Sequence, residues 1–136
     1  MSASYPLKSL GVTASEITAL KTAGIKTAAA LLEAAKTPKG RKELAQVSGL
    51  DPKRILELAN KADRMRVKGL GKEYADLLHV VGVDTVRELK YRNPGKLAEA
   101  MAAANKKRRL VRLVPTEKAV GRWVEDAKKL PPKISY

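Results

Sequence analysis

Two stretches of the chain share one pattern of glycine, leucine and threonine at a constant offset of 58 in residue number. The matching pairs are Gly11 and Gly69, Leu20 and Leu78, Gly24 and Gly82, Ile25 and Val83, Thr27 and Thr85, and Leu31 and Leu89. Each copy predicts a tight glycine turn, a helix of about ten residues that stops at a second glycine, and a further helix capped by threonine. A spacing kept over about 20 residues indicates an internal repeat. The chain is therefore expected to fold as short, closely spaced helices.

Capping residues and prolines predict the other helix boundaries. Thr13 and Glu16 form a capping box, and the pairs Thr37-Pro38, Asp51-Pro52 and Asn93-Pro94 each place a cap before a first-turn proline. Pro115-Thr116 opens the last helix, which Pro131-Pro132 closes. The expected helices include 14–23, 27–36, 52–66, 72–81 and 94–106. Together with the repeat, these helices predict an all-α fold class, a compact bundle of short helices.

The charge of the chain constrains its partners. Lys and Arg total 28 against 14 Asp and Glu, which gives a net charge of +14, and residues 61–136 carry +10 of it. A hydrophobic content of 44 % is too high for a disordered basic tail, so a folded surface of this sign is expected to attract polyanions. The absence of cysteine excludes disulfides and thiolate metal sites. The start does not resemble a signal peptide and no apolar run reaches the roughly 18 residues of a membrane span, so a cytoplasmic, nucleoid location is expected.

The segment from Val67 to Leu78 carries a more specific signal. It reads Val-Lys-Gly-Leu-Gly-Lys-Glu-Tyr-Ala-Asp-Leu-Leu, which resembles the helix-hairpin-helix motif: two glycines around an apolar residue form the hairpin, and Ala and Leu follow on the second helix. The wider chain resembles the largely bacterial domain-of-unknown-function family 4332. That resemblance is carried by segments 23–27, 37–44, 64–71, 82–86, 93–94, 123–125 and 131–132.

The resemblance implies two helix-hairpin-helix units packed as one compact domain, residues 1–136. Within it we expect a first, degenerate helix-hairpin-helix unit over 7–36, connecting helices over 37–66 and a second unit over 64–92. C-terminal helices with a basic connector follow over 93–130, and a tail over 131–136. In such families the hairpins typically hold the backbone of duplex DNA, often with a monovalent cation. A cation at the hairpin is thus compatible with the resemblance, and no other cofactor and no metal is expected.

The second hairpin has the chemistry of a phosphate site. The first amides of a helix are unpaired and sit at the positive end of its dipole, so they stabilise an anion. Gly69 and Gly71 remove the Cβ atoms that would keep a phosphate away, and Leu70 is free to point inward. Lys68 and Lys72 add mobile charge on either side. The alternative interpretation is a tight turn between packed helices and nothing more.

The first hairpin is expected to bind less well. Thr13 stands where the second hairpin has Gly71, and its hydroxyl is predicted to cap its own helix. Lys8 and Gly11 complete this hairpin. A structural role, as the pseudo-symmetric partner of the second hairpin, is favoured here over phosphate binding.

The densest basic cluster extends the predicted DNA-binding surface. It comprises Lys106, Lys107, Arg108, Arg109 and Arg112. Adjacent cations repel one another, which favours a polyanion that neutralises them over a merely solvated connector. Arg64 and Arg66, just before the second hairpin, are predicted to join the same surface.

The remaining chemistry-bearing residues predict no enzyme. His79 is the single histidine and has no metal partner at helical spacing, and Trp123 lies in an apolar stripe expected to dock the last helix onto the core. The leading hypothesis is sequence-independent binding of double-stranded DNA, with no membrane and no small-molecule substrate. The alternatives are a protein–protein interaction adaptor, with an acidic protein as partner, and a structured-RNA or ribosome-associated protein.

Overall fold

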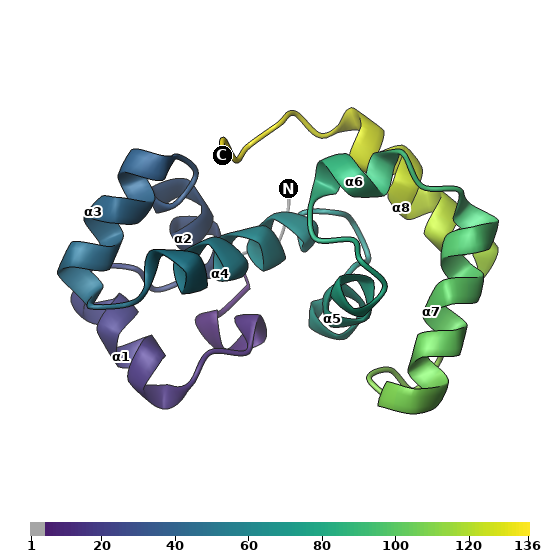
Figure 1. The fold of residues 1–136 in the computed structure, drawn as a ribbon, viewed down its shortest axis with the longest axis horizontal. Helices are drawn as coiled ribbons and strands as arrows, with labels where there is room; N and C mark the ends of the chain where they lie inside the picture. The colour runs from purple at the N-terminus through teal and green to yellow at the C-terminus, as the bar shows by residue number, and fades with distance from the viewer. Residues whose placement is uncertain (1–4) are drawn as a thin grey trace. The chain divides into compact units, whose positions relative to one another are not determined.

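The computed structural model describes residues 5–136, and all regular secondary structure in that range is helical (Figure 1). The elements are the 3-10 helix η1 (Leu7–Leu10) and the α-helices α1 (Ala14–Thr22), α2 (Ala28–Ala34), α3 (Pro38–Ser48), α4 (Pro52–Arg64), α5 (Lys72–Val80), α6 (Val86–Lys90), α7 (Pro94–Arg108) and α8 (Glu117–Lys129). The one β interaction of the described residues is an isolated bridge between Pro6 and Thr27. These observations confirm the predicted all-α class.

Helix starts follow the predicted caps. The Thr27 hydroxyl accepts from the Ala30 N–H over 3.1 Å, and the Asn93 side chain accepts from the Lys96 N–H over 3.0 Å. The capping box predicted at Thr13 is present, and Thr85 begins a second one. Because each cap satisfies an amide three positions ahead, these boundaries are set by local sequence.

Two helix ends in the repeated stretches share one geometry. Gly24 and Gly82 adopt φ values of +85° and +88°, conformations that glycine adopts without strain. At each, the following residue donates its N–H across the helix end, from Ile25 to the Leu20 carbonyl and from Val83 to the Leu78 carbonyl, both over 2.8 Å. This is the Schellman arrangement, which closes α1 and α5 at the predicted glycines.

The chain divides into two compact units. The first comprises residues 1–63 together with 133–136, and the second comprises residues 64–132. The predicted subdivision into smaller segments stays a prediction. No helix in the described range is long and apolar enough to cross a bilayer.

The first unit has an aliphatic core of its own and includes the last residues of the chain. Its fully buried side chains include Leu20, Leu31, Ile55 and Leu58. The Ser135 N–H donates to the Lys36 carbonyl over 2.8 Å, and the buried Arg41 guanidinium donates to the Ser135 carbonyl over 3.0 Å. Residues 133–136 are thus hydrogen-bonded parts of this unit.

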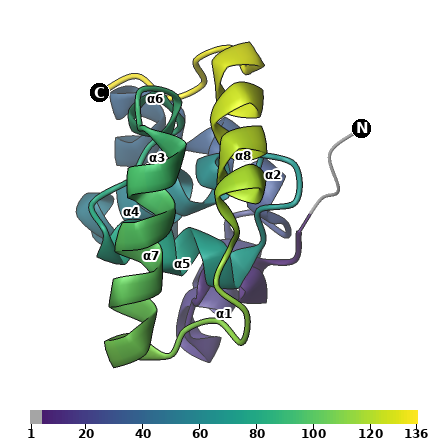
Figure 2. The ribbon, with the colours of Figure 1, turned by 90° about the vertical axis from the view of Figure 1, so that its right-hand side faces the viewer.

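The second unit packs α8 against α6 and α7, and α7 also against α5 (Figure 2). The apolar stripe of α8 is buried: Val120, Trp123, Val124 and Ala127 are at most 5 % exposed. The prediction that Trp123 docks the last helix onto the core is confirmed. This unit also carries 17 basic and 8 acidic residues, a net charge of +9.

Candidate nucleic-acid interface

The second hairpin, residues 67–72, adopts the backbone that its glycines suggest. Gly69 has a φ of +81°, and Leu70 is fully buried and donates its N–H to the Val67 carbonyl over 3.1 Å. Gly71 is extended and caps α5 without a side-chain hydrogen bond. The start of α5 therefore keeps the amide chemistry and dipole that favour an anion.

The face of this hairpin is open. A Cβ added to Gly71 would meet no atom within 4 Å, and one added to Gly69 would lie 3.8 Å from Trp123 Nε1. Lys68 and Lys72 on either side are both exposed. An anion could thus approach the backbone with two ammonium groups beside it.

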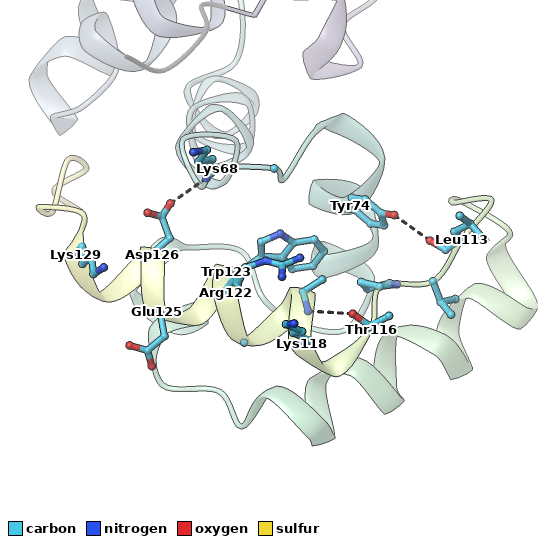
Figure 3. Close-up of a pocket in the computed structure, with 15 residues that line it drawn as sticks. Lys68, Tyr74, Leu113, Thr116, Lys118, Arg122, Trp123, Glu125, Asp126 and Lys129 are labelled. Carbon is cyan, nitrogen blue, oxygen red and sulfur yellow. Dashed lines mark hydrogen bonds between the residues drawn. The ribbon is translucent and has the colours of Figure 1, made fainter.

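One amide of the hairpin already holds an anion from the same unit. The Lys68 backbone N–H donates to Asp126 Oδ2 over 2.9 Å, and Asp126 reaches it from α8 (Figure 3). Sequence reasoning missed this residue, because the two partners are separated by 58 positions and no local pattern connects them. The hairpin region therefore combines cations, open backbone and one fixed carboxylate.

Of the two arginines ahead of the hairpin, Arg64 lies differently from the prediction. Arg64 is 4 % exposed, and its guanidinium donates to the Ala75 carbonyl over 3.2 Å and to the Asp84 carbonyl over 2.7 Å. Burial and these bonds make Arg64 a packing residue that ties the start of the unit to α5 and to the turn before α6. Arg66 is half-buried and donates to the Pro131 carbonyl over 2.9 Å. Arg64 therefore contributes no surface charge, whereas the place of Arg66 in the predicted surface stays a prediction.

The basic loop, residues 106–112, exposes all five of its cations: Lys106, Lys107, Arg108, Arg109 and Arg112. Its first three cations lie in the last turn of α7, where positive charge is favourable to the helix dipole. Arg109 ends the helix with a φ of +50°, the single positive value among the described non-glycine residues.

A side-chain clamp holds this loop in place. The Asn105 amide donates to the Val111 carbonyl and accepts from the Val111 N–H, both over 3.0 Å. The Arg109 N–H donates to the Asn105 carbonyl over 2.8 Å. The loop is therefore closed at its base, and its charges project from a fixed backbone.

A groove of about 1070 Å³ connects the hairpin to the segment that follows the basic loop (Figure 3). Hairpin residues Lys68 and Gly69 line it together with Leu113 and Val114. The Tyr74 hydroxyl, in the first turn of α5, donates to the Leu113 carbonyl over 3.0 Å. The centroid of the Tyr74 ring lies 5.1 Å from the centroid of the Trp123 ring. Further charged side chains of the groove come from α8: Lys118, Arg122, Glu125, Asp126 and Lys129.

The first hairpin has a different environment. Gly11 has a φ of +72° and Lys8 is exposed, but Thr13 caps α1 through its hydroxyl, as predicted. The Glu16 carboxylate accepts from the Thr13 N–H over 2.9 Å and from Arg54 Nε over 2.9 Å. Hydrogen bonding to Arg54, and then to the Thr13 backbone, lowers the pKa of Glu16 to about 2. The start of α1 is thus occupied by a carboxylate of its own helix.

His79 lies apart from both hairpins. It is exposed, and its Nδ1 is hydrogen-bonded to Asp84 Oδ1. The described part of the chain contains no group of three side chains arranged to hold a metal ion.

Comparison of the sequence with models of known protein families identifies one match. The family model described as a domain of unknown function, DUF4332, matches residues 10–130, which is most of the chain. No curated protein and no solved structure matches the chain.

Proposed function

The chain belongs to the DUF4332 family, and we propose that it binds double-stranded DNA without enzymatic activity and largely without regard to base sequence. The contacts are made by the backbone of the second hairpin, by Lys68 and Lys72, and by the basic loop. The partner is the sugar-phosphate backbone, because phosphate contacts position a protein without reading bases.

The observation that carries this proposal is the groove joining the hairpin to the chain beyond the basic loop. Tyr74, in the first turn of α5, is hydrogen-bonded to Leu113, which directly follows Arg112. This bond therefore holds the start of α5 beside the residue that follows the basic loop. A polyanion with regularly spaced charges fits such an arrangement better than a single small anion does.

Electrostatics supports the same partner. The second unit has a net charge of +9, and none of the five cations of the basic loop forms an ion pair with a described residue. Phosphates of duplex DNA would neutralise these cations and release condensed counterions, which gives affinity that falls steeply with salt.

We also propose that each unit is built around a helix-hairpin-helix element. The supporting observation is that α1 and α5 begin and end at positions with the same offset, with a positive-φ glycine before each helix and a Schellman glycine after it. In this proposal the first hairpin is structural, because Glu16 and Arg54 occupy the start of its helix.

A protein-interaction adaptor is the second candidate function. The observation in its favour is that Leu113 and Val114, beside the groove, are 78 % and 43 % exposed. Exposed apolar side chains of this kind are common at partner surfaces. DNA is the first proposal because these two residues directly follow the basic loop and line one groove with Lys118, Arg122 and Lys129 of α8.

The experiment is a fluorescence anisotropy titration of a labelled random-sequence duplex of about 20 base pairs, repeated from about 50 to 200 mM salt. If only four of the cations of the hairpin and the basic loop contact phosphates, affinity should already fall by about a hundredfold over that range, equally for unrelated sequences. Absence of binding at about 50 mM salt would overturn the proposal and favour the adaptor. A structured RNA of the same length, bound much more tightly than DNA, would identify RNA as the partner.

A further inference from the structure

We propose that Asp126 is a built-in competitor for the phosphate at the second hairpin, so that it sets how weakly and how reversibly the hairpin holds a nucleic-acid backbone. This inference rests on the proposed function and adds a regulating residue to the same site. Its basis is a carboxylate bonded to the Lys68 amide, in the same hairpin whose backbone leads into the start of α5.

The first step is geometric. Asp126 Oδ2 lies 2.9 Å from the Lys68 backbone nitrogen, a normal length for a hydrogen bond from an amide to a carboxylate. The carboxylate is half-buried, and Asp126 is one of the residues that line the groove (Figure 3). A phosphate oxygen reaching this N–H has to displace the carboxylate or share the amide with it.

The second step concerns charge. On α8, Arg122 lies four positions before Asp126 and Lys129 lies three positions after it, spacings that place side chains on one face of a helix. Both cations line the groove, as does Lys68. One fixed negative charge among three cations lowers the attraction that each offers to an incoming phosphate, and it repels the phosphate directly.

The third step compares the two units. When α4 and α8 are aligned through their buried residues, Ile55 matches Val120, Leu58 matches Trp123 and Ala59 matches Val124. In this alignment the position of Asp126 corresponds to Lys61. The Lys61 ammonium nitrogen lies 3.5 Å from where a Cβ on Gly11 would stand. Both units therefore bring a charged side chain of their last helix to a hairpin, but with opposite sign.

The test substitutes Asp126→Asn in the full chain. The asparagine has nearly the same shape and can still accept a hydrogen bond from the Lys68 N–H, while the negative charge is removed and one acceptor oxygen becomes an N–H donor. We expect duplex affinity to rise by about three- to tenfold at about 50 mM salt, as removal of one like charge in contact with the ligand implies. The dependence of affinity on salt should steepen by up to about one phosphate equivalent.

A matched control separates this local effect from net charge. Glu125→Gln makes the same change in net charge on the adjacent residue of α8, which also lines the groove but is paired with Lys128 over 3.1 Å. We expect its affinity to change by less than about twofold. Equal gains from the two variants would overturn the proposal in favour of a general charge effect.

The remaining outcomes are also decisive. Wild-type protein that binds with a steep salt dependence, together with an Asp126→Asn variant of unchanged affinity, would overturn the competitor role and leave the proposed function standing. Failure of both proteins to bind would overturn both. The thermal unfolding of each variant is also measured. If Asp126→Asn unfolds at a lower temperature than wild type, Asp126→Ala is tested in its place. Removal of the carboxylate should make this variant, too, bind the duplex more tightly than wild type.

Discussion

The Tyr74 hydroxyl donates to the Leu113 carbonyl over 3.0 Å, which ties the first turn of α5 to the residue after the basic loop. Tyr74→Phe removes this bond and keeps the ring that packs on Trp123. Loss of one partly exposed hydrogen bond should lower the free energy of unfolding by about 0.5–1 kcal/mol in urea titrations. Duplex affinity should fall by several-fold, because the hairpin and the loop lose their fixed spacing.

Tyr91→Phe is the control for this prediction. Tyr91 belongs to the same unit, is 75 % exposed and places its ring near the Lys90 ammonium, a contact that phenylalanine preserves. Affinity and stability should be unchanged. Equal losses in both variants would show that the Tyr74 bond does not position the interface.

Replacement of the two hairpin lysines should change how duplex affinity depends on salt concentration. Lys68→Ala with Lys72→Ala should weaken duplex binding by about 10- to 100-fold at low salt, by the same factor for unrelated sequences. The slope of log affinity against log salt should become shallower by about 2, since two phosphate contacts are lost. Anisotropy measures both quantities.

The matched double variant is Lys21→Ala with Lys26→Ala, which removes the same charge from two exposed lysines of the first unit. If it weakens binding as much as the hairpin variant, affinity follows net charge alone and the hairpin has no special part in it.

The two hairpin glycines should respond differently to alanine. Gly69→Ala places a side chain at a φ of +81°, which costs about 1–2 kcal/mol of stability. Gly71→Ala has a compatible backbone and meets no atom within 4 Å, but alanine is a poorer N-cap than glycine, so the unfolding free energy should fall by no more than about 1 kcal/mol. Its methyl group would nevertheless stand on the open face and should reduce duplex affinity. Chemical denaturation and anisotropy on both variants check this, and full affinity in Gly71→Ala would place the phosphate elsewhere.

Glu16 predicts a pH dependence of stability. Its pKa is lowered to about 2 in the folded protein, mainly by the Arg54 hydrogen bond, from an ordinary value of 4.5. A depressed carboxylate pKa adds stability above the unfolded value, and this stability is lost as the pH falls from about 4.5 toward 2. Glu16→Gln should therefore lower stability by about 1–2 kcal/mol at pH 7, with the difference from wild type disappearing near pH 2. The loss stays below what the full pKa shift implies, because Arg54 is partly exposed and solvent screens the pair.

Glu57→Gln is the control for the pH experiment. Glu57 contacts the same guanidinium at 3.4 Å but is 68 % exposed, so its loss should cost only a few tenths of a kcal/mol. Thermal unfolding across this pH range compares the three proteins. If the Glu16→Gln variant is still less stable than wild type at low pH, the loss of stability comes from packing of the amide and not from the lost charge.

The fold was largely predictable because its boundaries are local. Thr13, Thr27 and Thr85 each satisfy an amide three positions ahead, and Gly24 and Gly82 close their helices through bonds between near neighbours in the chain. Such bonds connect positions that a sequence pattern shows side by side. The helix starts and the all-α class followed from them.

The site was less predictable because its decisive contacts are distant in sequence. From the sequence, Arg64 is expected to be a surface cation. In the structure it is buried and donates to the carbonyls of Ala75 and Asp84, which lie 11 and 20 positions away. The bond between Lys68 and Asp126 joins residues 58 positions apart. Both contacts depend on how the helices pack, and neither produces a periodic or compositional pattern in the sequence.

The hydrogen bonds of residues 133–136 affect how the first unit forms during translation. That unit is discontinuous in sequence, so residues 1–63 are synthesised well before the segment that contains Ser135. Until that segment emerges, the Arg41 guanidinium lacks its Ser135 acceptor and the Lys36 carbonyl lacks its Ser135 donor. The unit that leaves the ribosome first is therefore completed only after the whole of the second unit has been made.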